Sequence, residues 1–116
     1  MKQPGQIAVL SFPQTDLIQG KRRPVLLLAQ PPGPHDDWWV CMLSTQLDQA
    51  VPDFDEILRP GDSDFATTGL RQESVIRVAR VAVVASRQLI GAIGAISAER
   101  LTRIRDKLVD WLKAAA

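Results

Sequence analysis

Two arginines and a short run of polar side chains are the residues of this 116-residue chain whose types and positions could do chemistry. Arg23 stands before Pro24 at the entrance to the apolar run 25–29, and a strand behind it would hold the guanidinium firmly. A planar guanidinium binds a phosphate through two parallel hydrogen bonds. The alternative is a strand-end arginine that pairs with a nearby carboxylate.

Ser44, Thr45 and Gln46 follow directly after the apolar segment 38–43. Three hydrogen-bonding side chains at the end of a strand could position a substrate. The same residue types are also common in turns, where they bond to the neighbouring backbone. The sequence leaves both interpretations open.

Arg77 and Arg80 interrupt the apolar segment 74–85. Side chains of a regular strand alternate between its two faces, so each arginine would be the only charge on its own face. A charge on an apolar face needs a partner, a groove or an interface. For Arg77, an ion pair with Glu73 would be a purely structural answer.

Short apolar segments bounded by Pro, Gly and polar residues predict the strands that must position these side chains. Trp38 and Trp39 are adjacent in one such segment, so one is expected to face the core and the other the surface. The expected strands are 6–12, 25–29, 38–43, a short one near Ile57, 74–85, and a short strand or turn within 88–96.

The end of the chain predicts a helix. Ser97 is a suitable N-cap because its hydroxyl oxygen can accept a backbone N–H of the first turn. Five apolar residues share one helical face, which predicts that they pack on the sheet. Short strands followed by one helix predict an α+β domain on a small, curled, mostly antiparallel sheet. The five residues are Leu101, Ile104, Leu108, Trp111 and Leu112.

Composition limits the function classes. The length suits one domain, 1–116, and the net charge is +1, so any contact with nucleic acid must be local. The longest basic run is Lys21-Arg22-Arg23, and the segment 36–64 is strongly acidic. No apolar run is long enough to span a membrane, and the N-terminus does not resemble a signal peptide, so we expect a cytoplasmic protein.

One cysteine and one histidine cannot form a usual zinc site, and no phosphate-binding glycine loop is present. We therefore expect no metal and no cofactor. His35 follows prolines and a glycine and is expected in an exposed loop. Cys41 lies in an apolar strand and is expected to be a small buried residue.

Five segments resemble, in order, the MazF/PemK (Kid) family of toxins from bacterial toxin–antitoxin systems. Residues 4–13, PGQIAVLSFP, are similar to the family's first strand, and RPVLLL at 23–28 resembles its Arg-Pro-aliphatic second strand. LSTQ at 43–46 matches its Thr/Ser-rich strand end, and ESVIR at 73–77 its Val-Ile-Arg segment. IGAIS at 93–97 resembles the sequence that leads into its final helix.

The resemblance implies an SH3-like, mostly antiparallel β-barrel with a C-terminal α-helix. It also implies a metal-independent endoribonuclease that cuts single-stranded RNA and a homodimer. A cognate antitoxin would lay an acidic segment over the RNA groove.

The resemblance also implies which residues are catalytic. Arg23 takes the position of the arginine that faces the scissile phosphate, and Ser44 that of the catalytic threonine. Arg77 takes the position of an arginine with an acid or charge-stabilising role. The substrate-binding candidates are Asp16, Lys21, Arg22, Thr45 and Gln46.

The chain departs from the Kid branch at the general base. That branch has an aspartate two residues after the arginine, and this chain has Ala79. Loss of a positioned base costs about 10²–10⁴-fold in rate, so we expect a slower enzyme or a substitute base such as Asp16.

Two other functions stay open. The missing base favours a weak or inactive MazF-like interaction module. A CcdB-like toxin directed at DNA gyrase would need an exposed tryptophan near the C-terminus. The place of Trp111 in the apolar stripe of the predicted helix disfavours that function.

Overall fold

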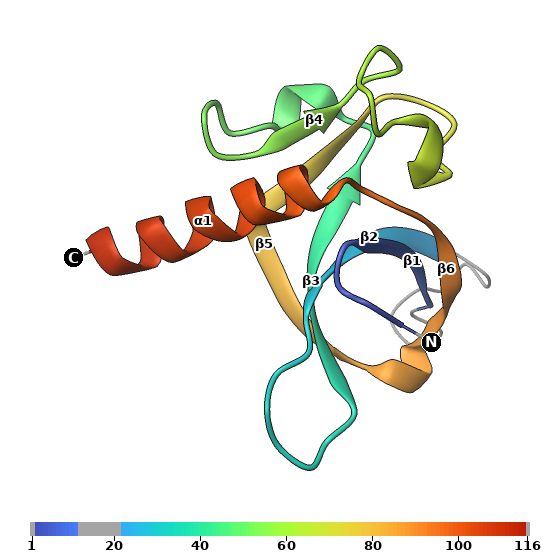
Figure 1. The fold of residues 1–116 in the computed structure, drawn as a ribbon, viewed down its shortest axis with the longest axis vertical. Helices are drawn as coiled ribbons and strands as arrows, with labels where there is room; N and C mark the ends of the chain where they lie inside the picture. The colour runs from blue at the N-terminus through green and yellow to red at the C-terminus, as the bar shows by residue number, and fades with distance from the viewer. Residues whose placement is uncertain (1, 12–21, 116) are drawn as a thin grey trace.

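Six strands and one long helix make up the part of the chain that the structure, a computed structural model, describes: residues 2–11 and 22–115. Three short 3-10 turns, Leu47–Gln49, Ala66–Thr68 and Ser86–Gln88, lie in the connections. The elements are β1 (Gln6–Ser11), β2 (Arg22–Ala29), β3 (Asp37–Ser44), β4 (Glu56–Leu58), β5 (Ser74–Ala85), β6 (Leu89–Ala95) and α1 (Ala98–Ala114) (Figure 1).

The six strands form one antiparallel sheet in the order β4-β5-β3-β2-β1-β6. The sheet curls strongly, and α1 lies across one of its faces (Figure 1). Its edge strands β4 and β6 are not hydrogen-bonded to each other, so the barrel-like sheet stays open along that line. The predicted α+β class and curled antiparallel sheet are confirmed.

The connection from β4 to β5 spans the opening between the two edges. A Cβ atom at Gly94 of β6 would lie 2.3 Å from the carbonyl carbon of Thr68. Gly69 has φ +77°, and a Cβ there would lie 2.2 Å from the carbonyl oxygen of Ile93. Backbone meets backbone at this crossing, and only glycine allows so close an approach. The connection therefore closes the barrel by close packing and by the hydrogen bond that Thr67 Oγ1 donates to the carbonyl oxygen of Ala95 at 3.1 Å, since no backbone ladder joins β4 to β6.

Two hydrophobic clusters lie on the two faces of the sheet. Because successive side chains of a strand point to opposite faces, Leu26 joins the cluster under α1 and Leu27 joins the other. Trp38 is buried in the second cluster, whereas Trp39 is 42% exposed, as the alternation predicts.

Helix α1 packs on the sheet from its start to Leu108. Ser97 Oγ accepts the backbone N–H of Arg100 at 3.1 Å, which confirms the predicted N-cap. Ile104 is fully buried, but Trp111 and Leu112 are 63% and 66% exposed where the helix projects from the body (Figure 1). The expectation that the whole apolar stripe packs is wrong for these last turns, because the helix extends beyond the sheet. Among the described residues, no helix has the length and apolar character to cross a membrane.

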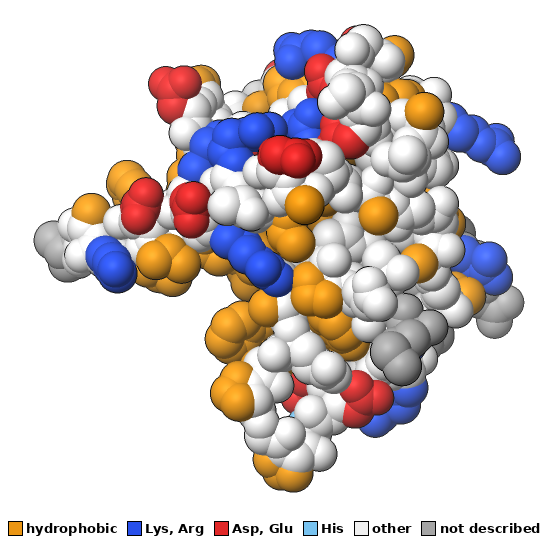
Figure 2. Space-filling view, in the orientation of Figure 1, with side chains coloured by type: hydrophobic (Ala, Val, Ile, Leu, Met, Phe, Trp, Pro, Cys, Tyr) orange, Lys and Arg blue, Asp and Glu red, His pale blue; other side chains and the backbone are white. Residues whose placement is uncertain are grey.

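A network of ion pairs fixes the start of α1. Arg100 donates to Asp64 and Glu56, both at 2.9 Å. Glu56 also accepts from Arg103 at 2.8 Å and Lys107 at 2.9 Å. Figure 2 shows basic and acidic side chains intermingled beside the helix. Part of the acidic segment 36–64 is thus neutralised by the helix.

Candidate functional site

A groove of about 480 Å³ opens where β2, β3 and β5 meet. Three of its described lining residues are arginines and none is acidic, which makes the groove positively charged. It brings Arg23, Ser44 and Arg77 together from distant parts of the sequence. The lining consists of Arg23, Met42, Leu43, Ser44, Gln46, Gln49, Arg77 and Arg80.

Strand register explains how three segments reach this groove. Val25 pairs with Met42, and Met42 pairs with Arg77, so these three residues form one row across the sheet. Arg23 and Ser44 lie two residues from Val25 and Met42 along their strands, and therefore share that face. Val25 belongs to the cluster opposite α1, so the groove opens on the face away from the helix.

The hydroxyl of Ser44 is fixed by a local turn. Its Oγ accepts the backbone N–H of Gln46 at 3.0 Å, which is the turn bond that the sequence left as an alternative. A hydroxyl has one donor and two acceptor sites, so its proton stays available to a ligand. The turn bond therefore leaves the Ser44 O–H free to donate to a ligand.

Arg77 makes few hydrogen bonds for a partly buried guanidinium. Its Nη1 donates to Gln49 Oε1 at 3.4 Å, and its Nε is buried with no hydrogen-bond partner among the described residues. Within residues 2–11 and 22–115 it forms no ion pair, so the alternative pairing with Glu73 is not realised. A buried N–H without an acceptor is costly, and an anion in the groove would supply one.

The pairing between β3 and β5 is interrupted next to Arg77. Cys41 pairs with Val81, whereas the following residue, Met42, pairs with Arg77. Residues 78–80 consequently have no partner on β3 and form a bulge in β5.

This bulge places Arg80 in the same groove as Arg77. A regular strand would put the two arginines on opposite faces, as the sequence analysis expected. That expectation is wrong because bulges change the direction of side chains that follow them. Sequence reasoning also missed Gln49, which carried no recognisable signal.

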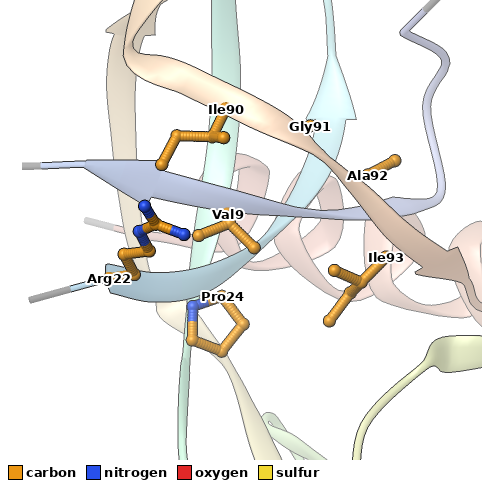
Figure 3. Close-up of a pocket in the computed structure, with 7 residues that line it drawn as sticks. All are labelled: Val9, Arg22, Pro24, Ile90, Gly91, Ala92 and Ile93. Carbon is orange, nitrogen blue, oxygen red and sulfur yellow. The ribbon is translucent and has the colours of Figure 1, made fainter. Parts of the chain in front are cut away.

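Two of the predicted substrate-binding residues do not line the groove. Arg22 faces the other side of β2, since it is the immediate neighbour of Arg23, and lines a separate depression of about 410 Å³ (Figure 3). Thr45 is exposed beyond the groove. Lys21 and Asp16 lie outside the described residues.

His35 and Cys41 lie where the sequence predicted. His35 is exposed in the loop before β3, and Cys41 is fully buried. Burial raises the pKa of the Cys41 thiol to about 12, and the nearby charge of Asp55 adds to the rise. The thiol therefore stays protonated and is no nucleophile. No cluster of three His, Cys, Asp or Glu residues that could hold a metal occurs in the described part of the chain.

Solved structures share the fold. The Mycobacterium tuberculosis toxin MazF-mt6 superposes with a TM-score of 0.64 at 18% identity, over 93% of this chain and 96% of that one. A structure described as an endoribonuclease in complex with its cognate antitoxin from a mycobacterial species gives a TM-score of 0.63 at 16% identity, over 100% and 99%. No curated protein sequence matches the chain.

A family model assigns the chain more directly than these distant structures do. The model is described as PemK-like, MazF-like toxin of type II toxin–antitoxin system, and it matches residues 3–112. The match includes every strand and nearly all of α1, together with all the groove residues. The chain therefore belongs to the PemK-like, MazF-like family of toxins of type II toxin–antitoxin systems.

Proposed function

We propose that this toxin is an endoribonuclease that cuts single-stranded RNA in the cytoplasm without a metal ion. The observation that carries the proposal is the groove in which Arg23 and Arg77 lie beside the Ser44 hydroxyl, with no acid among its described lining residues. Such a groove attracts a polyanion although the whole chain is nearly neutral. The description of a similar structure as an endoribonuclease supports the same activity.

RNA supplies its own nucleophile, the ribose 2′-OH next to the phosphate. Attack on phosphorus forms the new 2′-O–P bond and breaks the P–O5′ bond. The 2′-OH loses its proton to a base or to water, and the leaving 5′-oxygen takes a proton from water, which leaves a 2′,3′-cyclic phosphate and a 5′-OH. Arg23 and Arg77 donate to the non-bridging oxygens and stabilise the charge that develops on them. The Ser44 hydroxyl donates to the phosphate and keeps the 2′-oxygen in line.

The described lining of the groove offers no side chain that accepts a proton near neutral pH. Ala79 lies on the β5 bulge and lines a different, apolar pocket. Substitution Asp16→Asn tests the substitute base that the sequence suggested. A fall of about 10²–10⁴-fold assigns the base to Asp16, and an unchanged rate shows that cleavage proceeds without it.

The test is cleavage of short single-stranded RNAs in EDTA by wild type, Arg23→Ala and Arg77→Ala. We expect each substitution to lower the rate by about 10²–10³-fold, as removal of one transition-state donor does. Arg22→Ala is the matched control, because it removes the same charge from the adjacent position on the other face. Its rate should stay close to that of wild type.

Two results would contradict the proposal. Equal cleavage rates for wild type and Arg23→Ala would show that the groove takes no part in the reaction. No cleavage by wild type, over RNAs of varied sequence, would instead support the inactive interaction module, which should also cause no growth arrest when expressed without an antitoxin.

An antitoxin segment can occupy the same groove. Carboxylates pair with guanidinium groups through two parallel hydrogen bonds, so an acidic peptide competes with phosphate for Arg23 and Arg77. We therefore propose that the cognate antitoxin inhibits by covering this groove with acidic residues. The inhibitor should raise the apparent Kd for RNA and lose potency with Arg23→Ala.

The apolar surface on the helix side supports a homodimer. Trp39 and Val83 are exposed on β3 and β5, and Trp111 and Leu112 on the projecting end of α1. Hydrophobic side chains gather on both parts in Figure 2. Exposed apolar patches of this kind mark interaction sites, and a two-fold pairing would cover both parts at once.

The exposure of Trp111 also supports a second candidate function. The tryptophan touches Phe54 only edge-on, with ring centroids 6.1 Å apart, and so could insert into a protein such as gyrase. In that case Trp111→Ala abolishes inhibition of DNA supercoiling and growth arrest, whereas Arg23→Ala changes neither. The opposite pattern supports the ribonuclease.

A further inference from the structure

Asp55 is a buried carboxylate that forms no ion pair within the described part of the chain. Its residue is 9% exposed, and it lies directly before β4. Oδ1 accepts the backbone N–H of Val78 at 2.8 Å and, more weakly, that of Ala79 at 3.4 Å. Oδ2 accepts the backbone N–H of Val51 at 2.9 Å. Both oxygens thus bind backbone donors, in two different segments.

The first of these segments is the β5 bulge, residues 78–80. Having left the β3 ladder, the bulge cannot use strand carbonyls as acceptors, and an unpaired buried N–H is costly. Asp55 supplies the missing acceptor to Val78. Without it, regular pairing would regain those hydrogen bonds and turn Arg80 away from the face that Arg77 occupies.

The second segment leads from the groove to β4. Asp55 holds it at Val51, and two residues earlier Gln49 accepts the hydrogen bond from Arg77. One carboxylate therefore ties together the strand that carries both arginines and the loop that borders them.

We propose that Asp55 is a positioning residue that holds Arg80 in the groove beside Arg77, and that Arg80 is a further phosphate-binding residue. The inference rests on the proposed function, since the phosphate that Arg80 binds belongs to the RNA substrate. One phosphodiester carries a single negative charge, whereas the groove presents three guanidinium groups. Arg80 binds a phosphate that neighbours the one undergoing cleavage.

The first test is the salt dependence of binding to a non-cleavable 2′-O-methyl RNA. Each phosphate contact with a single strand adds about 0.7 to the slope of log Kd against log salt. Arg80→Ala should weaken binding and lower the slope by about 0.7. Arg87→Ala, which removes an exposed base that lines a different pocket beside residues 34–37, should leave the slope unchanged. If Arg80→Ala keeps the wild-type slope of log Kd against log salt, the proposal is overturned regardless of the results for the other variants.

The second test is a double-mutant cycle between Asp55→Asn and Arg80→Ala. Asparagine keeps the shape but points an N–H₂ group at a backbone donor. Electrostatics alone would make RNA bind more tightly after a negative charge is removed. Weaker binding by Asp55→Asn would therefore show that Arg80 has left its position in the groove. We expect Asp55→Asn to weaken binding about as much as Arg80→Ala and to add little to it in the double variant. Additive losses, or tighter binding, contradict the inference.

Asp64→Asn is the control for a general loss of folding stability. Asp64 is also buried and accepts a backbone N–H, from Ser97 at 3.0 Å, but on the helix side. It should lower Tm and leave the RNA slope unchanged. Cleavage by wild type is measured in parallel: RNA that is bound but not cut refutes the proposed ribonuclease only, and cleavage with an unchanged Arg80→Ala slope refutes this inference only.

Discussion

The substitution Glu56→Gln tests whether the ion network holds α1 on the sheet. The Glu56 side chain is 6% exposed and accepts hydrogen bonds from Arg100, Arg103 and Lys107. Burial acts to raise the pKa of Glu56, but the hydrogen bonds and charges of Arg103 and Lys107 outweigh it and lower the pKa from 4.5 to about 2.

This pKa shift sets the size and the pH window of the effect. A carboxylate whose pKa falls from 4.5 to about 2 on folding contributes about 3 kcal/mol at neutral pH. Because the folded pKa is the lower one, the contribution is complete above about pH 5 and is lost as pH falls toward about 2. Glutamine keeps the shape but not the charge, so we expect the free energy of unfolding to fall by about 3 kcal/mol at pH 7.

The measurement is urea unfolding followed by tryptophan fluorescence at about pH 7, 5 and 3. The difference between wild type and Glu56→Gln should shrink as pH falls. Glu99→Gln, at an exposed position in the first turn of α1, should change the free energy by less than about 0.5 kcal/mol. A gap below about 1 kcal/mol at pH 7, or one as large at pH 3 as at pH 7, would refute the reasoning.

Three further predictions concern the crossing, the groove and the apolar surface. Gly94→Ala should destabilise the fold by at least about 2 kcal/mol, because the new Cβ would clash with backbone atoms. Gly91→Ala, which has open space around its Cβ, should leave Tm nearly unchanged. Equal Tm values for the two variants would contradict the close backbone approach at Gly94. Ser44→Ala should lower RNA cleavage by about 10²-fold without a change in Tm, and Ser44→Thr should restore it; a rate equal to wild type for the alanine variant would exclude the hydroxyl. Val83→Lys, at a position 60% exposed, should convert a dimer into a monomer in sedimentation velocity and leave the circular dichroism spectrum unchanged; a persistent dimer would place the interface elsewhere.

The elements could be predicted because their signals are local. Pro, Gly and polar residues bound the apolar runs that became β2, β3 and β5, and Ser97 marks the start of α1 by its own hydrogen bond. The projection of Trp111 could not be predicted, because helical periodicity shows which side chains share a face but not where the sheet beneath them ends.

The groove was predictable only in part. Local sequence signals show which side chains share a strand face, but they do not show where strand pairing is interrupted. Arg23, Ser44 and Arg77 follow from regular strands and from the family pattern, and alternation of β2 explains why Arg22 lies elsewhere. Arg80 depends on a bulge held by a carboxylate 25 positions earlier in the chain. Such a long-range contact leaves no mark in local sequence.

The separation of charges between the two faces sets how the proposed RNA substrate would be held. On the helix side, the positive charges of Arg100, Arg103 and Lys107 are neutralised by ion pairs with Glu56 and Asp64. On the far face, Arg23, Arg77 and Arg80 line one groove and form no ion pair among the described residues. An RNA strand bound as we propose would therefore contact a small basic groove through a few consecutive nucleotides.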